Sequence, residues 1–182
     1  MASCKGCLIA AMAVVSLSFR IAEGSPIRVG GIGGIAEPDG HAGGNGTTGW
    51  FVGLHGERDV GEAGAIGLHA EFHDFPPAFG PPDGDIDHRL LGLSAMGRLF
   101  GRRHRGFADS GLGLFYRRFS VSAPDAADVI DFWGVGAQFG LGLASASRRF
   151  GIEGSYLVLL ESDGWSYIGR VGVFILTSIG TQ

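Results

Sequence analysis

WGVGAQFGL, residues 133–141, decides the fold prediction for this chain. Apolar side chains occupy every odd position of this stretch, and glycine or glutamine occupies every even position. Because side chains of a β-strand point alternately to opposite faces, the stretch predicts a strand with one apolar face and one small or polar face. Glycine weakens an ordinary solvent-facing strand, so a glycine-rich face indicates a place where backbones crowd, such as the inside of a narrow closed barrel.

The same alternation recurs along the chain after residue 24. No charged residue falls in the middle of an apolar face, where an arginine at the bilayer midplane would cost roughly 2–4 kcal/mol. The pattern therefore predicts an all-β fold, a closed antiparallel transmembrane β-barrel of about eight strands with up-and-down topology. The expected strands are 26–36, 49–58, 64–74, 88–100, 106–118, 129–142, 148–160 and 164–177.

The N-terminal segment has the pattern of a secretory signal. Lys5 supplies a positive charge, and residues 8–19 form an apolar stretch that is too short to span a bilayer as a helix. Small residues then place the expected cleavage before Ser25, so we expect a signal peptide at 1–24 and the barrel at 25–182. Cys4 and Cys7 would leave with the signal. The mature chain has no apolar stretch long enough for a spanning helix, so any membrane crossing must use strands.

The connections between the expected strands alternate in length. Residues 37–48, 75–87 and 119–128 are long, whereas 59–63, 101–105 and 143–147 are short, and a tight turn near 161–163 is the exception. Outer-membrane barrels have long outer loops and short periplasmic turns, so both termini are expected in the periplasm. Tryptophan and tyrosine favour membrane interfaces. Those near the outer strand ends form an expected outer aromatic rim: Trp50, Tyr116, Trp133, Trp165 and Tyr167.

Together, the signal, the strand pattern and the alternating connections resemble the small outer-membrane barrel proteins of OmpX and OmpA-barrel type. The resemblance covers residues 25–182 and is architectural, without a sharp motif. It implies a monomer in the cell outer membrane with a structural or surface-interaction role through its outer loops. Such proteins commonly end on an aromatic residue, whereas the last aromatic residue here is Phe174. Either the last strand stops near Leu176, or the assembly signal differs.

The polar faces predict a charged lumen. An eight-stranded barrel encloses little more than its own side chains, and opposite charges buried there must pair. Two interpretations stay open, a salt-bridged plug that connects the strands and a narrow ion channel. His69, Glu71 and His73 share a face, but strand residues four apart are separated by about 13 Å, so we expect no single metal ion to bind both histidines. The expected lumen polar network is His55, His69, Glu71, Arg98, Asp109, Arg117, Glu153 and Arg170.

No catalytic, cofactor-binding or metal-binding signature stands out, so we expect no enzyme and no cofactor. The outer connections are acidic, which suits divalent cations beside outer-membrane lipids. The proline-rich, apolar segment 75–87 suits either an extracellular protein partner or a stiff loop that folds over the barrel mouth, and nothing in the pattern indicates nucleic acid. A membrane-embedded lipid-modifying enzyme and a soluble lipophile-binding barrel remain as alternatives. The acidic residues of these connections are Glu37, Asp39, Asp74, Asp83, Asp85, Asp87, Asp125, Asp128, Asp131, Glu161 and Asp163.

Overall fold

The computed structural model describes residues 25–40, 47–76, 85–101, 105–123, 126–161 and 164–179. The expected signal peptide lies outside the described residues and stays a prediction. No helix in the described part is long and apolar enough to cross a membrane. The strands are β1 (Ile27–Gly40), β2 (Gly49–Val60), β3 (Gly64–Phe75), β4 (Asp85–Phe100), β5 (Gly106–Ala123), β6 (Ala126–Ala144), β7 (Phe150–Glu161) and β8 (Gly164–Ile179).

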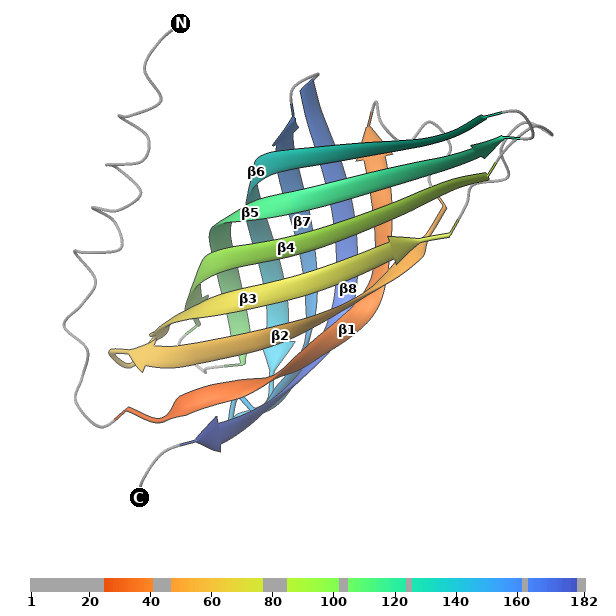
Figure 1. Cartoon of the computed structure of the whole chain (residues 1–182). Coiled ribbons are helices and arrows are strands. Elements are labelled where there is room, and N and C mark those ends of the chain that lie inside the picture. The colour runs from red at the N-terminus through yellow and green to blue at the C-terminus, as the bar shows by residue number, and fades with distance from the viewer. Residues whose placement is uncertain are drawn as a thin grey trace, which may run out of the picture.

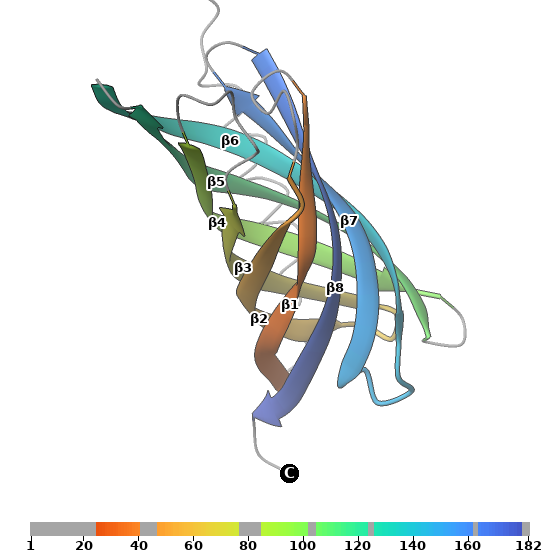
Figure 2. The same ribbon diagram turned by 90° about the vertical axis from the view of Figure 1, so that its right-hand side faces the viewer.

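Each strand pairs antiparallel with the next, and β1 pairs with β8, which closes the sheet into a barrel. Figures 1 and 2 show the strands strongly tilted around the barrel, as closure of a twisted sheet requires. One end of the barrel carries the three connections 61–63, 101–105 and 145–149, together with the start of β1 and the end of β8. We call this the turn end and the opposite end the loop end.

The two faces of the wall differ as the alternation predicts. Outside, large apolar side chains are exposed on every strand, including Leu54, Leu93, Leu141 and Ile175. Inside, arginine, histidine and carboxylate side chains are buried. A soluble carrier needs the reverse arrangement, with its apolar face inward around a ligand. The structure therefore does not favour the soluble lipophile-binding alternative and fits a barrel whose exterior faces lipid.

The strand predictions are confirmed for all eight strands, with two corrections at the ends. The long outer connection expected at 119–128 is wrong, because β5 and β6 stay paired as far as Ala123 and Ala126. Serine and valine in this segment are compatible with a strand, and the sequence pattern did not separate a long hairpin from a loop. The last strand does not stop near Leu176, because β8 continues to Ile179, which pairs with Ile27.

Candidate functional site

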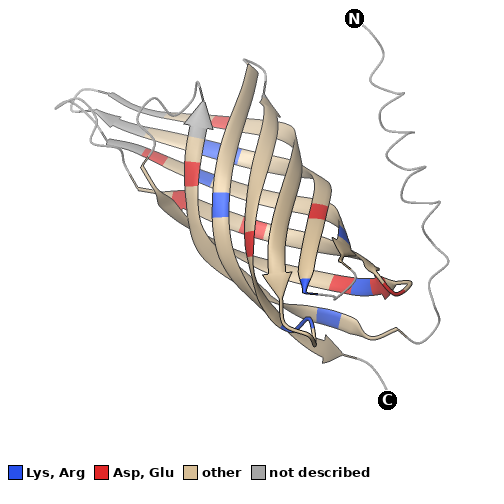
Figure 3. Cartoon of the chain, turned by 180° about the vertical axis from the view of Figure 1, so that it is seen from behind, with Lys and Arg blue, Asp and Glu red and all other residues tan. Residues whose placement is uncertain are grey.

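The charged lumen is the most distinctive part of the barrel. All eight residues of the expected lumen polar network are buried inside the wall. In Figure 3 acidic and basic positions lie on neighbouring strands across the wall. The polar side chains form three groups along the barrel axis, which we call the lower, middle and upper clusters from the turn end to the loop end.

The lower cluster is organised by Arg98 on β4. Its guanidinium lies 3.2 Å from Glu57 on β2, 3.3 Å from Asp109 on β5 and 2.9 Å from Glu153 on β7. The guanidinium carbon also lies 4.2 Å from the centre of the Phe107 ring, a cation–π contact that strengthens when water is excluded. One cation therefore connects three carboxylates from three other strands, and no carboxylate among them is left without a positive neighbour.

Two further arginines close the turn end of the lower cluster. Arg28 on β1 donates to Glu57 at 2.9 Å and to Asp59 at 2.9 and 2.5 Å. Arg148, in the turn before β7, lies 3.0 Å from Asp59 and donates to the carbonyl of Glu62 at 2.9 Å. Its backbone has a φ of 56°, a left-handed conformation that costs a non-glycine residue roughly 1–2 kcal/mol. The contacts that it makes across the turn end offset that cost.

The middle cluster centres on Glu71 of β3. Arg170 of β8 forms a hydrogen bond with Glu71 across the lumen, and it also donates to Ser155 at 3.1 Å and to Gln138 at 3.2 Å. The Nε2 atoms of His69 and His73 lie 3.4 and 3.1 Å from the same Glu71 oxygen. Both imidazoles therefore contact the same carboxylate, and the expectation that no single metal ion binds both histidines stays a prediction. Arg170 contacts that same oxygen, so the cationic position beside Glu71 is already filled.

The upper cluster combines Arg117 of β5 with aromatic rings. Arg117 donates to His88 at 2.6 Å and to Ser166 at 3.0 Å. His88 is stacked between two phenylalanine rings, with both ring centres 4.5 Å away. A continuous row of ring contacts crosses five strands at this level, in the order Phe51, His73, Phe75, His88, Phe119 and Phe132.

These three layers fill the lumen with paired charges and stacked rings. Within the described segments, no group of three or more histidine, cysteine or carboxylate side chains has an arrangement that could hold a metal ion. The arrangement can cross-link strands that are far apart in sequence, since Arg98 and Arg170 each contact side chains from three other strands.

Sequence reasoning missed several members of these clusters. Glu57 and Asp59 follow His55 at intervals of two, so the alternation itself places them on the inner face. Arg28 lies on the strand with the weakest alternation, where glycine dominates. Arg148 lies in a turn, and no periodic pattern indicates that its side chain reaches another turn.

The residues of the expected aromatic rim point outward. Trp133 is 75% exposed, and Trp50, Trp165 and Tyr167 are also exposed. Tyr116 packs on Trp133 with ring centres 5.1 Å apart, and its hydroxyl donates to Asp131 at 2.8 Å. Toward the loop end, the next outward row carries charge, because Arg89 pairs in register with Asp74 and with Arg118, and Arg118 pairs with Asp131. An apolar belt that ends in aromatic and then charged rows is the pattern of a membrane boundary.

The apolar exterior, the filled polar lumen and the closed eight-stranded wall define a small outer-membrane β-barrel. Solved structures of outer-membrane proteins share this fold, among them the following three. The attachment invasion locus protein Ail of Yersinia pestis matches with a TM-score of 0.57 and 16% identity, covering 85% of this chain and 99% of Ail. Neisserial surface protein A matches with a TM-score of 0.59 and 14% identity, covering 82% of this chain and 96% of the neisserial protein. The N-terminal β-barrel domain of Pseudomonas aeruginosa OprF matches with a TM-score of 0.59 and 11% identity, covering 84% of this chain and 99% of the OprF domain.

No protein-family model matches the sequence, and no curated protein sequence matches it. The likeness to the three barrels is therefore one of fold, and it agrees with the OmpX and OmpA-barrel type that the sequence resembles. The location that follows from this fold and from the lipid-facing exterior is the cell outer membrane.

Proposed function

We propose that this protein is a monomeric outer-membrane barrel whose lumen is a structural plug and whose outer connections contact partners outside the cell. The observation that carries the proposal is the set of ion pairs in the lower and middle clusters, above all the contacts of Arg98 with Glu57, Asp109 and Glu153. An ion passing through would have to break these buried ion pairs, which leaves buried charges without a partner at a high cost in free energy. We assign the barrel no catalytic role.

We expect the purified barrel to show no stepwise conductance in a planar lipid bilayer. A permeating ion would have to separate the Arg98 and Arg170 guanidinium groups from their carboxylates in succession, which leaves uncompensated buried charges. The matched variant Arg170→Ala removes one guanidinium from the middle cluster and should not by itself open a path, because the lower cluster still closes the turn end. Regular channel openings of the unmodified protein, at a frequency that scales with the amount of protein added, would contradict the plug.

One structural neighbour supports the surface role. Ail of Yersinia pestis, which shares the fold, was crystallised with the heparin analogue sucrose octasulfate. Most of the acidic residues expected in the outer connections lie instead on the strands near the loop end, namely Glu37, Asp39, Asp74, Asp85, Asp87, Asp128, Asp131 and Glu161. The loop end is therefore acidic, and a sulfated saccharide is a poor match for its charge. A partner with a basic surface, or one bridged by divalent cations, fits that charge better.

Replacement of residues 77–84 by a glycine–serine segment of equal length should reduce attachment of expressing cells to a serum-coated surface. This segment is the proline-rich part of the second outer connection, and the replacement leaves both flanking strands intact. Cells with an equally abundant barrel carrying Ser147→Ala, in an exposed position at the turn end, are the matched control. If cells with the unmodified barrel, with the 77–84 replacement and with Ser147→Ala all attach equally, this segment is excluded as the contact surface.

A further inference from the structure

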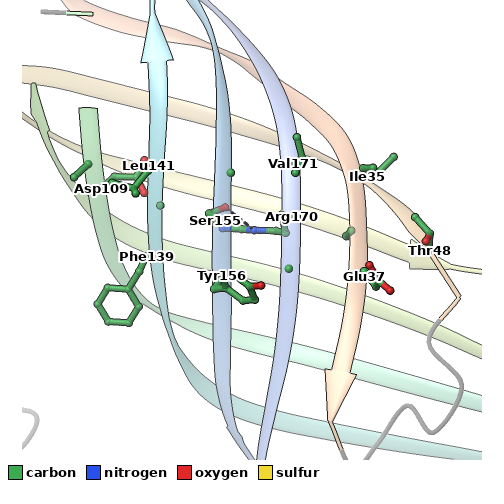
Figure 4. Close-up of a pocket in the computed structure, with 15 residues that line it drawn as sticks. Ile35, Glu37, Thr48, Asp109, Phe139, Leu141, Ser155, Tyr156, Arg170 and Val171 are labelled. Atoms are coloured by element: carbon green, nitrogen blue, oxygen red, sulfur yellow. Dashed lines mark hydrogen bonds between the residues drawn. The ribbon is translucent and has the colours of Figure 1, made fainter. Parts of the chain in front are cut away.

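The lipid-facing side of β6, β7, β8 and β1 contains a hollow of about 740 Å³. Two cross-strand rows of outward-facing residues surround it. The row nearer the loop end is Phe139, Tyr156, Gly169 and Glu37, and the next row is Leu141, Gly154, Val171 and Ile35. Figure 4 shows Phe139, Tyr156 and Glu37 on three of these strands, around the hollow.

Two glycines give the hollow its depth. Gly154 on β7 and Gly169 on β8 lie diagonally to each other, because Gly154 pairs with Val171 and Gly169 pairs with Tyr156. A Cβ atom at Gly154 would meet only the carbonyl of Arg170 at 3.9 Å, and one at Gly169 would meet the Tyr156 ring at 3.6 Å. The protein has room for a side chain at Gly154, and at Gly169 for a methyl group beside the Tyr156 ring, so backbone crowding does not account for glycine at these positions. Glycine at these positions leaves space for something outside the wall.

The polar groups of the hollow gather at its loop end. Glu37 is exposed on the outward face of β1, and within the described residues its carboxylate has no hydrogen bond or ion pair. Thr48, which precedes β2, adds a hydroxyl on the same side. Toward the turn end the lining is apolar, with Leu141 70% exposed and Val171 49% exposed. A bare carboxylate above an apolar hollow suits an amphiphile with a cationic head and an apolar tail.

We propose that this hollow binds a phospholipid whose headgroup carries a primary ammonium, with the ammonium against Glu37 and one acyl chain over Gly154 and Gly169. The ammonium supplies the positively charged partner that the Glu37 carboxylate lacks. The Thr48 hydroxyl can donate a hydrogen bond to the adjacent phosphate oxygens. The acyl chain replaces the missing side chains and contacts Leu141, Tyr156 and Val171. This inference rests on the membrane location of the barrel and is independent of the surface role proposed above.

The test compares lipids retained by the purified mature barrel in detergent, detected by native mass spectrometry. Phosphatidylethanolamine and phosphatidylglycerol with identical acyl chains are offered in equal amounts. The unmodified barrel should retain more phosphatidylethanolamine, and Glu37→Gln should lower the ratio of the two lipids by about fivefold, the upper range for an exposed ion pair. Gly154→Leu should lower retention of both lipids equally, because its side chain fills the hollow.

Gly97→Leu is the matched control, since a Cβ at this outward glycine of β4 would meet nothing within 4 Å. It should retain both lipids like the unmodified barrel. Mobility shifts on boiling in SDS gels establish that each variant is folded. The proposal is overturned if the lipid ratio is unchanged in Glu37→Gln, or if folded Gly154→Leu retains as much lipid as Gly97→Leu. A dimer that Gly154→Leu abolishes would also overturn it, because the hollow would then take a second copy of the chain.

Discussion

Arg98→Leu should lower the free energy of unfolding of the barrel by roughly 3–5 kcal/mol, the cost of removing one partner from a buried ion pair. Arg98 is buried and contacts Glu57, Asp109 and Glu153. Leucine fills part of the volume but leaves Asp109 and Glu153 facing each other in the lumen without that cation. Glu57 keeps Arg28 as a neighbour, so most of the loss should arise from Asp109 and Glu153.

Equilibrium urea unfolding in lipid vesicles, followed by tryptophan fluorescence, measures this loss. Arg89→Leu is the matched control, because its side chain is 55% exposed while it forms ion pairs with Asp74 and Asp87. Exposed pairs contribute about 0–1 kcal/mol, so this variant should unfold close to the unmodified barrel. If the two variants lose the same stability, the lower cluster does not act as a buried network.

The triple variant Arg98→Leu, Asp109→Asn and Glu153→Gln separates lost pairing from lost packing. It removes the cation together with the two carboxylates that depend on it most. We expect it to be more stable than Arg98→Leu alone, since replacing a whole buried charge group by neutral residues is often far less costly than breaking it. A triple variant that is less stable than the single variant would show that packing around Arg98, including its contact with Phe107, dominates.

The alternation of side chains was sufficient to predict the barrel because a β-strand has a period of two. Residues 133–141 and the other strand segments lie in the structure with the faces that this period assigns. The same rule places Arg98, Glu71 and Arg170 inside the wall from the sequence alone. Alternation predicts the face of a side chain only within a strand. It does not predict which inner side chains contact one another across the lumen.

The contacts that the sequence did not predict join residues that are far apart in the chain and come together only in the folded barrel. The pairing of Arg170 with Glu71 joins strands far apart in the chain, and the barrel closure alone brings them together. Arg148 reaches Asp59 from a turn, where no period exists. The extended β5–β6 hairpin reflects pairing between two segments, each of which is polar enough to be predicted as a loop when it is considered alone.

Gly34→Val should prevent most of the protein molecules from closing into a barrel. Gly34 faces inward on β1 and pairs with Gly172 on β8, at the seam where the first and last strands meet. A Cβ at Gly34 would overlap the carbonyl oxygen of Val171 and lie 2.6 Å from the Gly172 Cα. Backbone atoms cannot move aside as a flexible side chain does, so β1 and β8 would have to separate. Each lost ladder hydrogen bond costs about 0.5–1.5 kcal/mol, and a separated seam loses several of them.

The yield of folded barrel after refolding into vesicles, measured as the fraction that shifts mobility on boiling, reports closure directly. Gly97→Val is the control, because it adds the same side chain to an outward position of β4 with open space around it. Valine favours strands, so this control should refold at least as well as the unmodified chain, while Gly34→Val should yield mostly unfolded or aggregated protein. Equal yields would mean that the seam tolerates a side chain and that closure does not depend on the close approach of β1 and β8. Gly34→Ala should lie between the two, because its single methyl group meets the same backbone atoms without the further bulk of valine.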